Sequence, residues 1–139
     1  MEGTPIMASK SFTAGSDLLP IYEELCSLIS HYSPPFVPRE VKADKPQYHL
    51  WSIQDVVIAG RKKKEVYFAG AIVQKGYVGF YYMPVYAKPG IKKVFPPEIL
   101  KLLKGMSCFH IQALTPQLKK HLRAALQVGF QLYQERGWV

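Results

Sequence analysis

The feature that most constrains the fold is the segment at residues 75–86, which reads KGYVGFYYMPVY. Five of its twelve residues are aromatic, and none of the twelve is acidic. Aromatic side chains fit the pleated, half-buried surface of a β-sheet, whereas charged side chains do not. We therefore expect a strand over residues 77–83, preceded by a tight turn at Lys75-Gly76.

Three further strand patterns precede this segment. The sequence predicts strands at residues 48–51, 55–59 and 65–74, with a polar turn (GRKKK) at residues 60–64. Because the connections are short, consecutive strands should pair as hairpins, and the sheet should be an antiparallel meander. A fifth short strand is expected at residues 107–111.

The chain before the first strand is expected to hold one helix between two irregular segments. Residues 1–16 are small, polar and aperiodic, which predicts a flexible N-terminal leader. Apolar residues then recur at three- and four-residue steps, which predicts a helix over residues 17–32 with Asp17 as its N-cap. Residues 33–46 contain several prolines and are expected to be a connection without regular structure.

Two more helices are predicted after the aromatic strand. The first should begin at Pro97 and end at Gly105, a residue suited to a helix C-terminus. The second should take Thr115 as its N-cap and run to about Arg136. The residues of this helix expected to face inward are Leu118, Leu122, Ala125, Leu126, Gly129 and Tyr133. We therefore expect residues 17–139 to form a single α+β domain, in which an antiparallel β meander carries helices packed on one face.

Side-chain alternation along the aromatic strand predicts two unlike faces. Val78, Phe80 and Tyr82 should point to one side, and the odd-numbered residues from Tyr77 to Met83 to the other. One set should meet the helices. The other face is uncharged and rich in tyrosine. In the more frequent arrangement, residues 33–46 or the leader cover this face. The alternative is that the face binds a ligand or partner.

Charge and cysteine content limit the environment and the partners. Eighteen Lys+Arg against ten Asp+Glu give a formal charge of +8, which favours anionic partners, although only 20% of the residues are charged. Cys26 and Cys108 lie far apart, which favours reduced thiols. No stretch approaches the ~20 apolar residues of a membrane span, and the N-terminus lacks the apolar core of a secretory signal. We expect a cytoplasmic protein.

The first functional hypothesis is a non-catalytic domain that binds a small molecule or a protein segment on its aromatic face. None of the common local signatures of hydrolases, nucleotide-binding loops or zinc proteases occurs in the sequence, which favours a protein that is not an enzyme. An enzyme of a novel type stays an alternative, and the sequence identifies neither its reaction nor a cofactor. The candidate binding residues are Trp51, Tyr67, Lys75, Tyr81, Tyr86 and His110.

Two alternatives remain open. Cys108 and His110 are two residues apart on a predicted strand, so they share a face and would supply two metal ligands, although a packed cysteine and a hydrogen-bonded histidine are the more frequent state. The second alternative is a nucleic-acid site formed by the consecutive basic residues Arg61, Lys62, Lys63 and Lys64, which would contact phosphates. A solvated turn without a binding role is the more frequent state of such residues. An exposed edge of the meander also allows a homodimer.

Three segments resemble a known family. The chain is similar to the domain-of-unknown-function 1801 family, the YdhG-like proteins, in KGYVGFYYMPVY (75–86), LKGMSCFHI (103–111) and the segment between the predicted second and fourth strands, AGRKKKEVYFAGAIVQ (59–74). The likeness covers roughly residues 18–137 and implies a small cytoplasmic α+β fold. One branch of this family is described as a frataxin-like intracellular iron chaperone, which implies the metal alternative. Residues 105–107 read GMS where the family has a GKG-type segment.

Overall fold

The main sheet has six antiparallel strands. The computed structural model describes residues 14–139, so most of the predicted leader lies outside the described residues. The strands pair in the order β1-β2-β5-β6-β8-β7. Their bounds are β1 Val37–Val41, β2 Gln47–Ser52, β5 Val66–Val73, β6 Val78–Tyr82, β7 Leu103–Lys104 and β8 Cys108–Ile111. The α+β class and the antiparallel sheet are confirmed.

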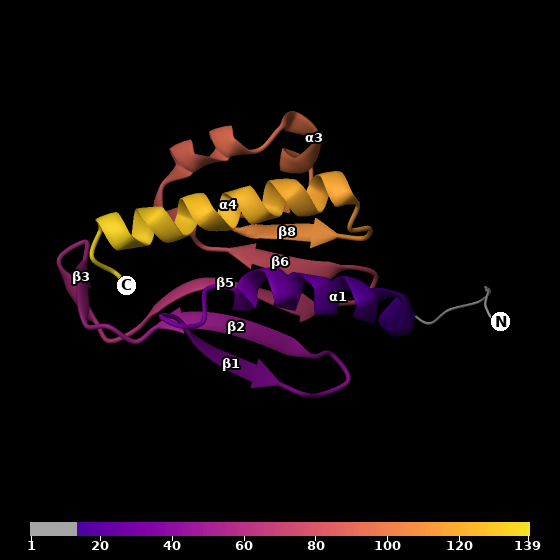
Figure 1. The fold of residues 1–139 in the computed structure, drawn as a ribbon, viewed down its shortest axis with the longest axis horizontal. Coiled ribbons are helices and arrows are strands. Elements are labelled where there is room, and N and C mark those ends of the chain that lie inside the picture. The colour runs from indigo at the N-terminus through magenta and orange to yellow at the C-terminus, as the bar shows by residue number, and fades with distance from the viewer. Residues whose placement is uncertain (1–13) are drawn as a thin grey trace.

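Two long helices cover one face of this sheet. They are α1 (Ala14–Ser30) and α4 (Pro116–Glu135), which lie over the strands on the same side and roughly along them in Figure 1. Short helical segments connect β6 to β7, namely α2 (Pro84–Ala87), the 3₁₀ helix η1 (Pro89–Val94) and α3 (Pro97–Leu100). No helix within residues 14–139 is both long enough and apolar enough to cross a bilayer.

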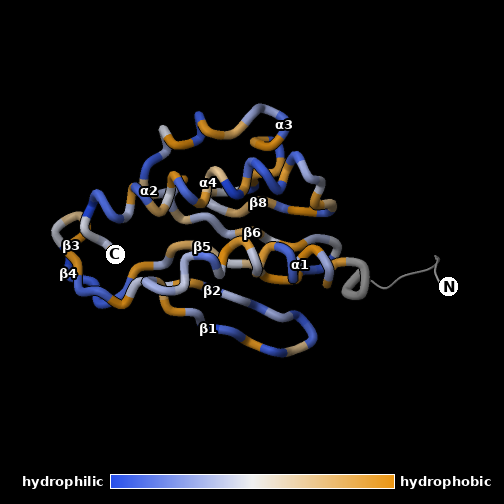
Figure 2. Tube along the Cα trace, viewed as in Figure 1, coloured by the Kyte–Doolittle hydropathy of each residue, from blue (hydrophilic) through white to orange (hydrophobic). Residues whose placement is uncertain are grey.

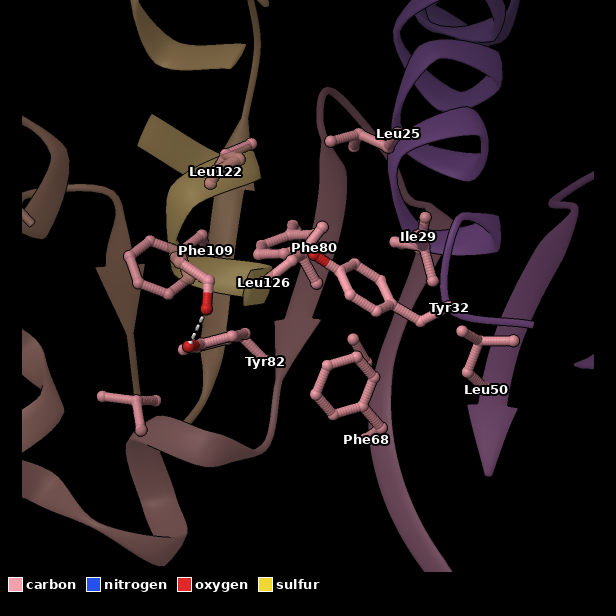
Figure 3. Close-up of a cluster of buried hydrophobic side chains, with 14 of the residues drawn as sticks. Leu25, Ile29, Tyr32, Leu50, Phe68, Phe80, Tyr82, Phe109, Leu122 and Leu126 are labelled. Carbon is pink, nitrogen blue, oxygen red and sulfur yellow. Dashed lines mark hydrogen bonds between the residues drawn. The ribbon is translucent and has the colours of Figure 1, made fainter. Parts of the chain in front are cut away.

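The core lies between the sheet and the helices. Val78, Phe80 and Tyr82 are fully buried, which confirms the predicted alternation of the aromatic strand. In Figure 3, Phe80 and Tyr82 lie among side chains from α1 and α4, such as Leu25 and Leu126. Figure 2 shows the corresponding pattern in both helices, where hydrophobic and hydrophilic residues alternate along the trace. Each helix therefore buries one stripe and exposes the other.

Helix α4 begins and packs as the sequence predicts. The Thr115 hydroxyl accepts a hydrogen bond from the Leu118 amide at 3.0 Å, which satisfies one of the free donors of the first turn. All six residues expected to face inward are buried: Leu118, Leu122, Ala125, Leu126, Gly129 and Tyr133. At Gly129 an added Cβ would lie 2.6 Å from Pro84 Cγ, so only glycine allows α4 to approach α2 this closely.

A β-bulge in β5 resets the alternation of its side chains, so that Phe68 and Ala69 both lie on the helix side and Tyr67 lies on the other face. Leu50 pairs with Ala69 and Trp51 pairs with Tyr67, so Phe68 has no partner in β2. Phe68 is completely buried on the helix side, where it stacks on Phe36 with ring centroids 4.3 Å apart. Since a bulge redirects the side chains around it, Tyr67 is directed to the other face beside Trp51.

The structure corrects the prediction for the N-terminal part. Helix α1 is already present at Ala14, so Asp17 is not its N-cap and residues 14–16 do not belong to a leader. Residues 33–46 are not irregular throughout, because they contain the edge strand β1. This strand was missed because Pro38 and exposed charged residues interrupt any apolar alternation.

Two further predictions were wrong. The segment predicted as a polar turn contains strand β4 (Arg61–Lys63), which pairs with β3 (Val56–Ile58) in a separate hairpin, so the predicted second strand does not join the main sheet. The turn itself is Ala59-Gly60, where both residues have positive φ. The helix predicted up to Gly105 ends at Leu100, because Leu103–Lys104 pairs with β8 instead.

Candidate ligand pocket

The sheet face opposite α1 and α4, called here the open face, carries most of the predicted binding residues. Strand pairing places Trp51 beside Tyr67, Gly70 between His49 and Tyr81, and His110 beside Gly79. The aromatic residues and histidines of this set are all partly exposed. Residues 33–46 do not cover this face, because β1 extends the sheet at its edge. The open face is therefore a partly solvated aromatic surface.

A short hydrogen-bonded chain crosses the open face. The Tyr67 hydroxyl lies 2.7 Å from Nδ1 of His49, and Nε2 of His49 lies 3.0 Å from Oε1 of Gln47. Burial lowers the pKa of His49 and raises the pKa of Tyr67, so both groups are neutral. Because Gln47 Oε1 can only accept, Nε2 carries the imidazole proton and the Tyr67 hydroxyl donates to Nδ1.

At one end of the open face lies a pocket of about 850 Å³. It is bounded by the β3–β4 hairpin, the end of β2, the start of β5, α2 and the C-terminal end of α4. Its lining residues are Trp51, Val57, Ile58, Ala59, Lys63, Glu65, Val66, Tyr67, Met83, Tyr86, Ala87, Tyr133, Arg136 and Trp138. This volume is within the range of small-molecule sites, which are typically ~300–1,000 Å³ and mostly apolar.

Two edge-to-face aromatic pairs contribute to the pocket lining. Trp51 and Tyr67 have ring centroids 5.0 Å apart, and Tyr133 and Trp138 have centroids 4.9 Å apart. The Tyr133 hydroxyl donates to the Tyr67 carbonyl at 2.7 Å, which links the two pairs. The Ser52 hydroxyl donates to the Trp138 carbonyl at 2.5 Å and fixes the segment after α4. Such contacts hold the aromatic groups in place before any ligand arrives.

The rim of the pocket is apolar on two sides. Val57, from the hairpin, is 63% exposed, and Tyr86, from α2, is 56% exposed. Large apolar side chains at this level of exposure gain from contact with a ligand or partner, because binding removes their surface from water.

The charged groups of the pocket are two cations and one carboxylate. Glu65 forms a salt bridge with Arg39 at 2.5 Å, and this hydrogen bond lowers the pKa of Glu65. Within the described part of the chain, no carboxylate lies within 4.0 Å of the Lys63 amine or the Arg136 guanidinium. The pocket therefore has one acid that is paired with Arg39, and two basic groups that form no ion pair with a carboxylate of the described residues.

The predicted binding residues fall into three groups. Trp51, Tyr67 and Tyr86 line the pocket. Tyr81 and His110 lie on the open face but outside the pocket, and His110 stacks on Tyr77 with ring centroids 3.8 Å apart.

Lys75 belongs to neither of these groups. It follows the C-terminal end of β5, whereas the pocket lies at the N-terminal end of this strand. The prediction missed Arg136 and Trp138, which reach the pocket from the C-terminal segment ERGWV. The sequence feature that could have indicated this part of the pocket is Trp138, which directly follows Gly137 at the end of α4.

The two alternative sites lie on different parts of the fold, the first on β8 and the second on the β3–β4 hairpin. Cys108 and His110 project to the same face, but the described residues contain no group of three or more His, Cys, Asp or Glu side chains placed to hold a metal. Burial raises the pKa of Cys108, so it is a thiol. The metal site stays a prediction. The basic residues at 61–64 are all exposed on the β3–β4 hairpin.

No match was found among protein-family models, curated proteins or solved structures. The likeness to the domain-of-unknown-function 1801 family therefore stays a prediction, which depends on the three segments quoted above.

Proposed function

We propose that this protein is a binding domain that takes a small molecule with an aromatic core into the pocket at the end of the open face. The observation that carries the proposal is the pocket itself, about 850 Å³ in volume, where Trp51, Tyr67 and Trp138 line the walls and the fully buried Tyr133 packs behind Trp138. Aromatic rings bind other rings by offset or edge-to-face contact, and each such pair contributes roughly 0.5–1.5 kcal/mol beyond burial.

The residues of the pocket favour binding over acid–base catalysis. A general acid or base needs a titratable group that faces the substrate and has a pKa near the working pH. Glu65 is the carboxylate among the described lining residues, and its hydrogen bond with Arg39 holds its pKa below the usual value. His49 contacts Tyr67 behind the pocket wall and does not line the pocket.

The two tryptophans make the proposal directly testable. The chain contains two tryptophans, Trp51 and Trp138, and both line the pocket. An aromatic compound that enters should change their emission, and the variants Trp51→Phe and Trp138→Phe should each retain part of that change. Calorimetry then gives the affinity of each compound. A chemically diverse set of aromatic compounds that leaves the emission unchanged up to about 1 mM would rule the proposal out.

A second candidate function is nucleic-acid binding through the β3–β4 hairpin. The observation that favours it is the exposure of Arg61, Lys62, Lys63 and Lys64 on one hairpin, in a chain with a formal charge of +8. Contacts of this kind release counterions, so affinity should fall steeply as salt rises.

The two functions are separable because only Lys63 belongs to both sites. A triple variant, R61Q/K62Q/K64Q, should reduce the anisotropy of a labelled single-stranded oligonucleotide and leave the tryptophan response to aromatic compounds intact. No binding of the oligonucleotide at low salt would exclude this second function.

A further inference from the structure

We infer that the ligand of the aromatic pocket is an anion, of the class of aromatic carboxylates. This inference rests on the proposed function and adds a charge to the expected ligand. Its basis is the position of Arg136 and Lys63, which reach the same pocket from α4 and from the hairpin.

Arg136 is held at the pocket wall by two contacts. Its Cζ lies 4.9 Å from the centroid of the Trp138 ring, and its Nη1 donates to the Ala87 carbonyl at 3.3 Å. A guanidinium has five N–H donors in a planar fork, and this fork matches the geometry of a carboxylate. Stacking on Trp138 orients the plane and still leaves donors for a ligand.

Lys63 supplies the second positive charge from another element. It is exposed on β4 and lines the pocket beside Val57. The strand register sets Lys63 opposite Val56, which is buried, so the hairpin is anchored in the core while the lysine stays at the surface. The two cations reach the same pocket from separate elements, so a negative group bound in this pocket would be stabilised by both positive charges.

The acidic residue of the pocket does not neutralise these cations. Glu65 pairs with Arg39, and the Arg39 guanidinium also lies 4.9 Å from the centroid of Trp51. The local balance is therefore positive next to apolar walls. An aromatic carboxylate fits both features of the pocket, because its ring would pack against the apolar walls and its carboxylate would bind the two cations. A compact anion is expected, since two cations cannot compensate a polyphosphate.

Matched pairs of ligands separate the contribution of the charge to affinity from the contribution of the ring. Indole-3-acetate and indole-3-acetamide differ in charge at nearly the same shape, as do 1-naphthoate and 1-naphthamide. We expect each carboxylate to bind at least about tenfold more tightly than its amide, which is the scale of one charge-assisted hydrogen bond. This preference should shrink with added salt.

Variants identify the groups responsible. R136Q and K63Q should each remove most of the preference for the carboxylate and leave amide binding nearly unchanged. Both residues are exposed, so the fold should tolerate either change. K45Q removes the same charge from an exposed residue that does not line the pocket, and it should keep the preference.

The outcomes distinguish this inference from the proposed function. Equal binding of acids and amides, or an undiminished preference in both R136Q and K63Q, would overturn the anion assignment and leave the aromatic pocket standing. Failure of all four compounds to bind in calorimetry, at concentrations up to about 1 mM, would overturn both. A preference that K45Q reduces as much as R136Q does would show that net charge, and not these two residues, is responsible.

Discussion

The hydroxyl of Tyr67 donates a hydrogen bond to Nδ1 of His49 over a distance of 2.7 Å, between neighbouring strands of the open face. The bond fixes both rings, since His49 in turn donates from Nε2 to Gln47. It also orients the Tyr67 ring, which forms part of the pocket wall and contacts Trp51 edge to face. A side chain of the pocket wall is therefore held in place by a polar contact outside the pocket.

Removal of the Tyr67 hydroxyl should destabilise the fold modestly. We expect Tyr67→Phe to lower the free energy of unfolding by about 1 kcal/mol, because the buried Nδ1 of His49 loses its donor. Urea unfolding followed by circular dichroism measures this change. Tyr77→Phe is the control, because the Tyr77 ring stacks on His110 and the substitution preserves that ring. Equal losses in the two variants would contradict the role of the bond.

Stability should depend on pH through His49. Burial lowers its folded pKa below the ordinary 6.5, so the unfolded state takes up the proton first as pH falls. The neutral form in the fold therefore contributes stability above about pH 6.5, and this contribution is lost as pH falls through the folded pKa. Unfolding midpoints measured between about pH 5 and 8 should rise with pH, and His49→Gln should flatten the rise. An unchanged slope in this variant would contradict the assignment.

Gly70 should be intolerant of any side chain. A Cβ at this position would overlap with the Tyr67 hydroxyl and His49 Nδ1, and would lie 2.7 Å from the Tyr48 carbonyl oxygen. We expect Gly70→Ala to lower the free energy of unfolding by about 1–3 kcal/mol, as overpacking does in well-packed regions. Gly90→Ala is the matched control, because nothing lies within 4 Å of its added Cβ. Denaturant midpoints of the two variants give the comparison.

The N-cap of α4 should contribute measurably to stability. Thr115→Ala removes the acceptor of the Leu118 amide and should cost about 1 kcal/mol. Thr115→Ser keeps a hydroxyl in the same place and should restore most of the loss. Thermal and urea unfolding of the wild type and the two variants measure the change in stability. An alanine variant as stable as the serine variant would show that the cap does not contribute to stability.

The rim of the pocket should affect affinity without affecting the fold. Tyr86 is 56% exposed and lines the pocket, so Tyr86→Ser should weaken binding of 1-naphthoate and leave the unfolding midpoint nearly unchanged. Met106→Ser is the control, because Met106 is 69% exposed and does not line the pocket. Calorimetry on both variants separates a local contact from a general loss of apolar surface.

The strong local patterns predicted most of the fold. Alternation over residues 77–83 correctly separated the set with Phe80 and Tyr82, which is in the core, from the set on the other face, and the spacing of α4 correctly gave its buried stripe. The errors occurred where tertiary pairing overrides local preference. The segment after Pro97 is helix-like in sequence, yet Leu103–Lys104 gains more from pairing with β8.

The pocket could be predicted only in part, because its walls come from distant segments. Trp51 and Tyr67 belong to the aromatic strands and stand out in the sequence. Trp138 reaches the same site through long-range contacts, among them the hydrogen bond from the Ser52 hydroxyl to its carbonyl, which joins residues 86 apart in the sequence. A pattern confined to neighbouring residues contains no information on such a contact.

Strand β1 also affects how the protein behaves when it is concentrated. It is the outermost strand of the sheet on that side, and it contains Pro38, which has no amide proton, followed by Arg39 and Glu40. A foreign strand that docked there would miss one backbone bond and would meet alternating charges. This edge therefore protects the domain against growth into fibrils.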